Sequence, residues 1–216
     1  MKKEERVLGY YVLTNLLKDL IRKGWQDWNV NKERIESVAE HIYGTQQLAI
    51  AMHNTYNYKI DLYKVIFMLA IHELEETKIK DLTQHDISRE EKTIIGHAAV
   101  QHIIEKYGLK QSIQDLIFEF DERKTDEAKF AYMCDKLECD IQCKIYDEEN
   151  LVDLHNQNNK ALDNERVSRL LAEGKTWSEM WMEFGREHVP YDDNFRSVSE
   201  FAETHNLHDL RENPDE

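Results

Sequence analysis

The chain has little of what tight turns require. Only 7 glycines and 2 prolines occur among its 216 residues. Because glycine and proline set the backbone angles of many turns, their scarcity disfavours a fold built from many short strands. Valine and isoleucine rarely alternate with polar residues, which also disfavours strands. We therefore predict long helices and an all-α fold.

Motifs that would indicate a reaction are also missing. The sequence has no glycine-rich phosphate loop, no Cys-x-x-Cys pair and no serine-centred nucleophile elbow. Its 3 cysteines are Cys134, Cys139 and Cys143, all on one predicted helix. An odd number of neighbouring cysteines does not indicate a disulfide framework. We interpret them as small buried apolar residues rather than as soft metal ligands.

Long apolar runs and excess positive charge are absent as well. No run of about 20 apolar residues is present, so we expect no membrane span. The opening MKKEERVLGYYVL lacks the apolar region of a signal peptide, and we expect a cytoplasmic protein. With 28 Lys and Arg against 43 Asp and Glu, the formal charge is −15. That balance argues against a nucleic-acid polymer as partner, whereas a small nucleotide remains compatible with local cations.

Apolar periodicity predicts helices over most of the chain. Local signals place several ends: Asp61 and Thr125 as N-caps, Ser88 with Glu91 as a capping box, and Gly108 as a stop. The predicted helices cover residues 13–24, 33–56, 62–76, 88–107, 112–122, 125–146, 149–173 and 177–184. The segment 62–76 is apolar nearly all round, which is typical of a central helix.

We predict one helical bundle of roughly eight helices over residues 1–204. The pattern weakens after Pro190, and residues 205–216 are polar and acidic. Such a composition is typical of a flexible tail.

Four residues in separate segments are candidate metal ligands: His41, the adjacent His72 and Glu73, and Asp135. Two imidazoles and two carboxylates suit Mn²⁺, Fe²⁺, Co²⁺, Ni²⁺ or Zn²⁺. However, the chain has 10 histidines, and some will lie near carboxylates by chance. A single histidine such as His41 is more often a surface or core residue than a ligand. Spacing alone leaves both interpretations open.

The acidic segment after His72 extends the candidate site. Glu76 lies four positions after His72, so a continuous helix would place both side chains on one face. A carboxylate there is suited to hold and deprotonate a water molecule. Asp81 is suited to assist Glu76 or to share a second cation with it. The structural alternative is an acidic helix end on the surface, although acidic residues at a helix C-terminus oppose the macrodipole.

These segments together resemble the HD-domain phosphohydrolases, and the most similar branch is the 5′-deoxynucleotidases. The resemblance runs in order through residues 13–145. It is carried by four segments: 22–25, 36–41, 71–77 with Asp81, and 122–130 leading into 135–138. Each segment alone would be weak evidence, and the four together in the right order are specific.

The resemblance implies an all-helical fold, a role for each matched residue and, as a partner, a second copy in a homodimer. The implied metal ligands are His41, His72, Glu73 and Asp135. Glu76 corresponds to the acid that acts on the attacking water. Asp81 corresponds to an acidic position near the substrate or near a second ion such as Mg²⁺. Arg22 and Trp25 match positions that contact the phosphate and sugar of a nucleotide. Alternatively, Trp25 is a hydrophobic plug after a helix stop, and Arg22 is a plain surface residue.

One position departs from the family pattern, because Glu73 stands where the family has aspartate. Glutamate keeps the carboxylate but is longer by about 1.5 Å. Metal–ligand distances tolerate only about ±0.2 Å, so the backbone, the ion or the binding mode must adjust. Some HD relatives hold a second metal with two further histidines. His97 and His102 are five positions apart, a poor fit to one helix face, and we interpret them as solvent-facing or core residues.

The leading hypothesis is a metal-dependent phosphomonoesterase that releases phosphate from nucleoside or deoxynucleoside 5′-monophosphates. The presence of Glu73 motivates an alternative, a metal-containing nucleotide-binding or regulatory protein with little or no turnover. A third hypothesis is a helical interaction module that binds no ion. The sequence does not fix the base, the sugar or the native metal.

Overall fold

The structure is a computed structural model that describes residues 1–83 and 85–210. Within these residues the chain forms α-helices, short 3-10 turns and no strand. An isolated antiparallel bridge pairs Ile21 with Ser37. The all-α prediction is therefore confirmed. None of the helices in the described ranges is long and apolar enough to cross a membrane.

The chain divides into two compact units. The first comprises Met1–Gln26 and Arg34–Cys134, and the second comprises Asp27–Glu33 and Asp135–Glu216. Helix α8 (Asp126–Glu148) contributes residues to both. The single domain predicted over residues 1–204 stays a prediction. Of the predicted tail, Leu207–Leu210 forms a 3-10 turn, and residues 211–216 lie outside the described residues.

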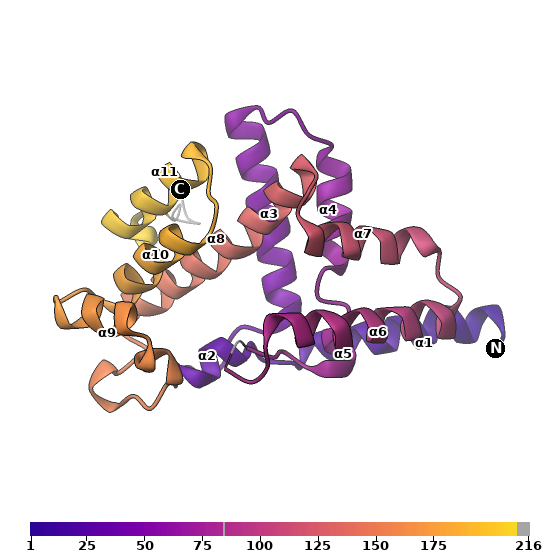
Figure 1. Ribbon diagram of the computed structural model, residues 1–216, viewed down its shortest axis with the longest axis horizontal. Helices are drawn as coiled ribbons and strands as arrows, with labels where there is room; N and C mark the ends of the chain where they lie inside the picture. The colour runs from indigo at the N-terminus through magenta and orange to yellow at the C-terminus, as the bar shows by residue number, and fades with distance from the viewer. Residues whose placement is uncertain (84, 211–216) are drawn as a thin grey trace, which may run out of the picture. The chain divides into compact units, whose positions relative to one another are not determined.

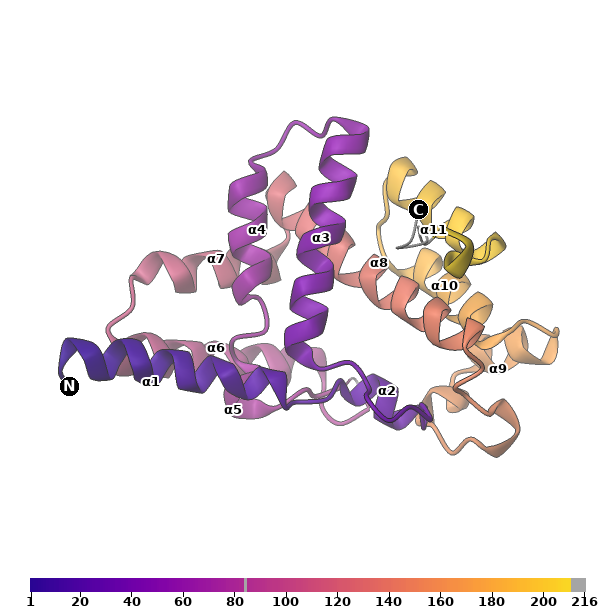
Figure 2. The same cartoon turned by 180° about the vertical axis from the view of Figure 1, so that it is seen from behind.

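The first unit is built from pairs of packed helices (Figures 1 and 2). Helix α3 packs against α4, and α1 packs against α6, so that Leu13 joins a core with Val100 and Ile103. The rings of Tyr10 and Tyr107 meet edge to face with centroids 6.1 Å apart. The helices of this unit are α1 (Lys3–Asn15), α2 (Lys23–Asp27), α3 (Val38–Tyr56), α4 (Leu62–Ile71), α5 (Glu76–Ile79), α6 (Arg89–Tyr107), α7 (Gln111–Glu122) and the start of α8.

Local signals fix several helix ends as predicted. Ser88 Oγ accepts from the Glu91 amide, and the Glu91 carboxylate accepts from the Ser88 amide, so α6 begins with a capping box. At its other end Gly108 takes a φ of 60°, which glycine adopts without a Cβ penalty. An unpredicted second capping box, between Ser37 and Glu40, starts α3.

Helix α4 differs from its prediction in two ways. It ends at Ile71, and residues 72–75 form turns before the single-turn α5 begins at Glu76. The amide of Glu76 donates to the Glu73 carbonyl at 3.2 Å, a three-residue spacing that tightens the chain. Its apolar surface is also only partly covered: Val65, Met68 and Leu69 are buried as expected for a central helix, whereas Tyr63 is 90% exposed and Phe67 46% exposed.

The second unit contains the later part of α8 with α9 (Glu165–Ala172), α10 (Trp177–His188) and α11 (Asp193–Thr204). The predicted stripe on α10 is confirmed as core packing, since Trp177 is buried and its ring centroid lies 5.7 Å from that of Trp28. The helix predicted over 149–173 forms only at α9. Asparagine side chains cap short turns in the preceding stretch, Asn159 accepting from the Ala161 amide at 2.7 Å.

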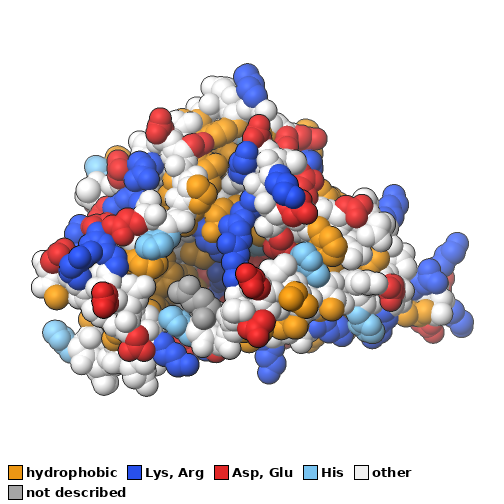
Figure 3. Space-filling view, viewed as in Figure 1, with side chains coloured by type: hydrophobic (Ala, Val, Ile, Leu, Met, Phe, Trp, Pro, Cys, Tyr) orange, Lys and Arg blue, Asp and Glu red, His pale blue; other side chains and the backbone are white. Residues whose placement is uncertain are grey.

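Charge is mixed over the face of the protein drawn in Figure 3. Lysine and arginine side chains there are interspersed with aspartate and glutamate. This distribution fits the acidic composition, in which basic residues are outnumbered. Two of the cysteines, Cys134 and Cys143, are buried, as expected for small apolar core residues.

Candidate metal centre

Three of the predicted ligands meet inside the first unit. His41 lies in the first turns of α3, and His72 and Glu73 lie in the turn that ends α4. Glu73 Oε1 is 3.8 Å from His41 Nε2 and 3.5 Å from His72 Nε2. One ligand atom from each residue lies within 4.8 Å of the others, and all three residues are buried. The turn at residues 72–75 allows consecutive side chains to face inward, which a regular helix would separate.

Contacts around His72 determine which of its nitrogens faces the group. Its Nδ1 lies 2.8 Å from the carbonyl oxygen of Leu69. Because a carbonyl only accepts, Nδ1 carries a proton, so Nε2 is the nitrogen whose lone pair can bind a metal when the ring is neutral. The ring also meets Phe120 edge to face, with centroids 5.1 Å apart. The Nε2 lone pair and the Glu73 carboxylate are both electron-rich, and a cation bound between them would stabilise both. The set of donor atoms therefore fits a divalent metal ion.

The Glu73 carboxyl is held in its ionised form. Burial raises its pKa. The positive charges of a protonated His72, of Lys92 and of Arg22 outweigh burial and lower the pKa to about 2. Arg22 Nη1 lies 3.4 Å from Glu73 Oε1. An ionised carboxylate is the form that binds a metal ion.

Glu76 lies beside this group with a different environment. Its side chain is buried, and one oxygen, Oε1, lies 3.1 Å from Lys92 Nζ. The other, Oε2, is buried and accepts no hydrogen bond from any described residue. Burial, followed by the charges of Glu73 and Asp81, raises the pKa of Glu76 well above its usual value. A raised pKa is suited to a carboxylate that takes up a proton at neutral pH.

Arg22 and Asp81 are also brought to this region. The amide of Arg22 donates to the Glu36 carbonyl at 3.0 Å, which fixes the backbone beside the start of α3. Asp81 Oδ2 lies 3.9 Å from Arg22 Nη1 and accepts from the Lys23 amide at 2.8 Å. Asp81 therefore connects the loop after α5 to the segment that contains Arg22 and Lys23.

Trp25 is part of the core in this structure. It is 2% exposed, and its indole Nε1 donates to Glu36 Oε2 at 2.6 Å. Its predicted contact with a nucleotide sugar stays a prediction. Glu36 was not singled out from the sequence, although a buried tryptophan usually requires an acceptor nearby.

Asp135 lies on α8, one residue beyond Cys134, the last residue of the first unit. It is 4% exposed, and Lys136 Nζ lies 2.8 Å from its Oδ2. Its role as a ligand stays a prediction. Of the rival histidines, His97 pairs with Asp121 at 2.7 Å and His102 is exposed.

Lys92 is the residue that sequence reasoning missed. It lies in the first turns of α6, where a cation opposes the helix macrodipole. This unfavourable position could have indicated a site residue, because carboxylates near Lys92 would offset the cost of placing a lysine there. Its contact with Glu76 spans 16 positions and is not visible in any local pattern.

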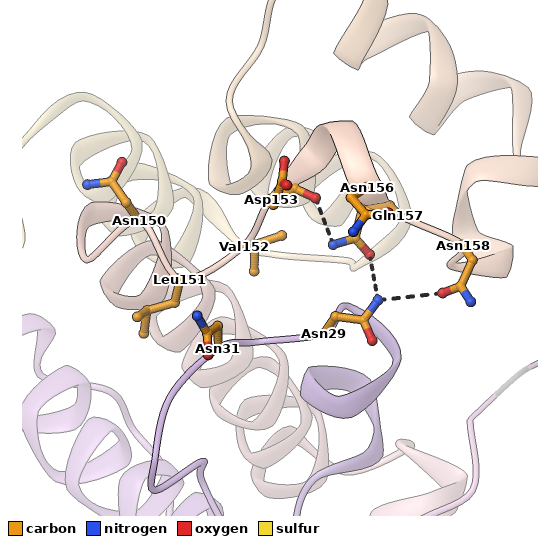
Figure 4. Close-up of a pocket in the computed structure, with 9 residues that line it drawn as sticks. All are labelled: Asn29, Asn31, Asn150, Leu151, Val152, Asp153, Asn156, Gln157 and Asn158. Atoms are coloured by element: carbon orange, nitrogen blue, oxygen red, sulfur yellow. Dashed lines mark hydrogen bonds between the residues drawn. The ribbon is translucent and has the colours of Figure 1, made fainter.

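A cavity of about 510 Å³ lies elsewhere, within the second unit. Amide side chains dominate its lining, and Asn29 Nδ2 lies 3.5 Å from the side-chain oxygens of both Gln157 and Asn158 (Figure 4). Asn29 and Asn150 have φ values of 53° and 57°, a conformation that asparagine tolerates well in turns. None of the predicted site residues lines this cavity.

Comparisons with known proteins identify the family. The HD domain family matches residues 14–173. The 5′-deoxynucleotidase HDDC2 of Dictyostelium discoideum is 30% identical over 150 residues, which cover 66% of this chain and 78% of that protein. The protein of the same name from Xenopus laevis is 30% identical over 145 residues, covering 66% and 70%.

Solved structures show the same fold. The chain is similar to a protein of Pyrococcus horikoshii, with a TM-score of 0.64 and 20% identity over 91% of this chain and 98% of that one. A conserved protein of Pyrococcus furiosus gives 0.62 and 23% over 90% and 98%. Taken with the family match over most of the length, these findings show that the chain belongs to the HD domain family.

Proposed function

We propose that this protein is a divalent-metal-dependent phosphohydrolase that releases phosphate from nucleoside or deoxynucleoside 5′-monophosphates. The observation that carries the proposal is the buried group of His41, His72 and ionised Glu73 in an HD-family chain. The relatives named 5′-deoxynucleotidase support the substrate class.

The proposed metal ligands are His41, His72, Glu73 and Asp135. Asp135 directly follows Cys134 on the continuous helix α8. When bound, the ion polarises the phosphate and lowers the pKa of a water molecule towards about 7. Imidazole and carboxylate ligands suit Mn²⁺, Fe²⁺, Co²⁺, Ni²⁺ and Zn²⁺, and the native ion is not assigned.

In this proposal Glu76 accepts the proton of the attacking water at Oε2. The water oxygen forms a bond to phosphorus, and the bond from phosphorus to the 5′ oxygen breaks. The departing 5′ oxygen takes up a proton from solvent water and leaves as the nucleoside hydroxyl, and Glu76 returns its proton to solvent afterwards. A buried carboxyl with a raised pKa is suited to take up the proton of the attacking water near neutral pH.

Arg22 and Asp81 bind and orient the substrate in the same proposal. The guanidinium of Arg22 offers paired donors that match phosphate oxygens. Asp81 keeps Arg22 in place through their 3.9 Å approach. Trp25, through its hydrogen bond to Glu36, supports the backbone from which Arg22 projects.

The test is a phosphate-release screen over ribo- and deoxyribonucleoside 5′-monophosphates with each of several divalent ions. We expect release with at least one ion and its loss on chelation. His72→Ala should lose both bound metal and turnover, whereas His102→Ala changes an exposed histidine and should keep both. Phosphate release by metal-free His72→Ala protein would refute the proposal.

The contact between Glu73 and Arg22 favours a second candidate, a nucleotide-binding protein with little turnover. A carboxylate 3.4 Å from a guanidinium is partly neutralised as a metal ligand. Glu73→Asp separates the two functions. A large gain in turnover would indicate an enzyme with a retuned or decayed site, and an active wild type with no gain would show that glutamate is competent.

A further inference from the structure

The cavity of the second unit is lined mainly by amide side chains (Figure 4). Five asparagines and one glutamine are among its nine lining residues, together with the carboxylate of Asp153. Its volume of about 510 Å³ lies within the range of about 300–1,000 Å³ that small-molecule sites occupy. Such sites are usually lined by apolar side chains, so this cavity suits a ligand whose surface forms hydrogen bonds.

Two separate segments of the chain form the cavity, and hydrogen bonds hold them together. The backbone amide of Asn31 donates to the Leu151 carbonyl at 2.8 Å. The Nε2 of Gln157 donates to the carbonyl of Trp28 at 2.9 Å and to that of Asp153 at 3.0 Å. The Oε1 of Gln157 is therefore held in one direction as an acceptor. A polar group that is already held in place loses less entropy when a ligand binds to it.

Other amides of the cavity are held loosely or face solvent. Asn29 Nδ2 lies 3.5 Å from the side-chain oxygens of both Gln157 and Asn158, which is longer than a usual hydrogen bond. Asn31 and Asn156 also line the cavity, and both residues are exposed. A ligand can therefore replace weak contacts or water at these amides with hydrogen bonds of normal length.

The charge of the lining restricts the ligand further. Among the described residues, none of those that line the cavity is lysine, arginine or histidine. Lys32 follows Asn31 in the chain, but its Nζ lies 2.5 Å from Glu149 Oε2. An anion would therefore lack a charged donor and would approach the carboxylate of Asp153. A cation is matched poorly too, because Oδ1 of Asp153 already accepts from the His155 amide at 2.9 Å.

We propose that this cavity binds an uncharged molecule with several hydroxyl groups, either a free sugar or a nucleoside. Each side-chain amide offers donors and an acceptor, and each hydroxyl both donates and accepts, so adjacent hydroxyls of a ring find partners among adjacent amides. Leu151 and Val152 also line the cavity and offer contacts for the C–H groups of such a ring. This binding site goes beyond the proposed phosphohydrolase activity and does not depend on it.

The experiment measures binding to the full chain by ligand-observed NMR titration. The probes form two matched pairs, glucose with glucuronate and adenosine with its 5′-carboxylate. The charged member of each pair is a carboxylate, so a phosphohydrolase cannot consume it. We expect saturable binding of at least one neutral probe, and binding of its charged partner that is weaker by about tenfold or more, because a charge is left unpaired. Binding of glucose identifies a sugar site, and binding of adenosine alone identifies a nucleoside site.

Variants then place the binding in this cavity. Asn31→Leu/Asn156→Leu removes two exposed amide side chains and keeps both backbone amides, which donate to the carbonyls of Leu151 and Asp153. It should weaken binding of the neutral probe by about tenfold, the effect of losing roughly two hydrogen bonds. The control Asn54→Leu changes an exposed asparagine on α3 and should keep the wild-type affinity.

A charge variant tests the basis of the selectivity. Asn156→Lys places a cation in the lining and should strengthen binding of the charged probe, whereas Asn54→Lys should not.

The absence of saturable binding of both neutral probes would overturn the inference. So would equal affinities within each pair, or an Asn31→Leu/Asn156→Leu variant that binds as wild type does. These measurements involve no turnover. Their failure would therefore leave the proposed function standing, and a failed phosphate-release screen would leave this inference standing.

Discussion

Replacing Asp140 by asparagine tests the electrostatics of the second unit. Asp140 lies on α8, is 3% exposed, and accepts a hydrogen bond from the Tyr191 hydroxyl at 2.8 Å. A Cβ at Gly185 would lie 3.1 Å from its Oδ2, so the carboxyl group lies close to α10 at a position where glycine leaves space for it. Burial raises its pKa to about 7, although the Tyr191 hydrogen bond and the charge of Arg186 lower it.

The sign of the effect follows from the two protonation states. The folded protein keeps the Asp140 proton up to about pH 7, whereas the unfolded chain releases it near 3.8. Between these values the unfolded state binds fewer protons, so the free energy of unfolding falls as the pH rises. The full difference is about 4 kcal/mol, at about 1.36 kcal/mol per pKa unit. Between about pH 5 and about pH 8, the expected loss is about 2 to 3 kcal/mol.

The assay is urea unfolding of wild type and Asp140→Asn at those two pH values. The stability of the variant relative to wild type should improve by about 2 to 3 kcal/mol on going to the higher pH. Tyr191→Phe should show the opposite pH dependence. It removes the hydrogen-bond donor to the Asp140 carboxylate, so relative to wild type it should lose more stability at the higher pH. If the difference in the free energy of unfolding between wild type and Asp140→Asn does not change with pH, the reasoning is refuted.

Three further predictions concern the first unit. Glu76→Gln should keep its metal, by elemental analysis, and lose roughly 10²- to 10⁴-fold in kcat, and unchanged turnover would contradict its role. Arg22→Ala should raise the KM for a nucleoside monophosphate by about tenfold or more, because charge-assisted hydrogen bonds to phosphate are lost. The control Arg34→Ala changes an exposed arginine and should leave KM unaltered. If both variants raise KM equally, a contact between Arg22 and the phosphate is refuted. Trp25→Phe should lower the free energy of unfolding in urea by about 1 to 3 kcal/mol, because Glu36 loses a buried donor; no loss would show that this bond is dispensable.

Sequence reasoning succeeded for the fold where the determining interactions are local. The ends of α6 follow from Ser88, Glu91 and Gly108, which act on backbone within a few residues of themselves. It failed for α11, whose start depends on Asp192 accepting from the Asn194 and Phe195 amides after a break in the apolar pattern. It also failed over 149–164, where asparagine side chains compete with a helix.

For the site, the residues alone named candidate ligands but left open whether these side chains lie close together. The resemblance supplied the order of His41, His72 and Glu73, and the structure supplied the turn that brings the last two inward. Lys92 could not be placed from the sequence, because its contact with Glu76 depends on how α5 packs against α6. Periodicity reports which face of a helix is buried, but not which partner covers it.

The central claim is that His41, His72, Glu73 and Asp135 bind one divalent cation. Anomalous diffraction from crystals soaked in Mn²⁺ tests it most directly. We predict a strong peak within coordination distance of the two imidazole nitrogens and both carboxylates, with His72 Nδ1 still bonded to the Leu69 carbonyl. An absent peak, or ligands that point away from one another, would contradict the account.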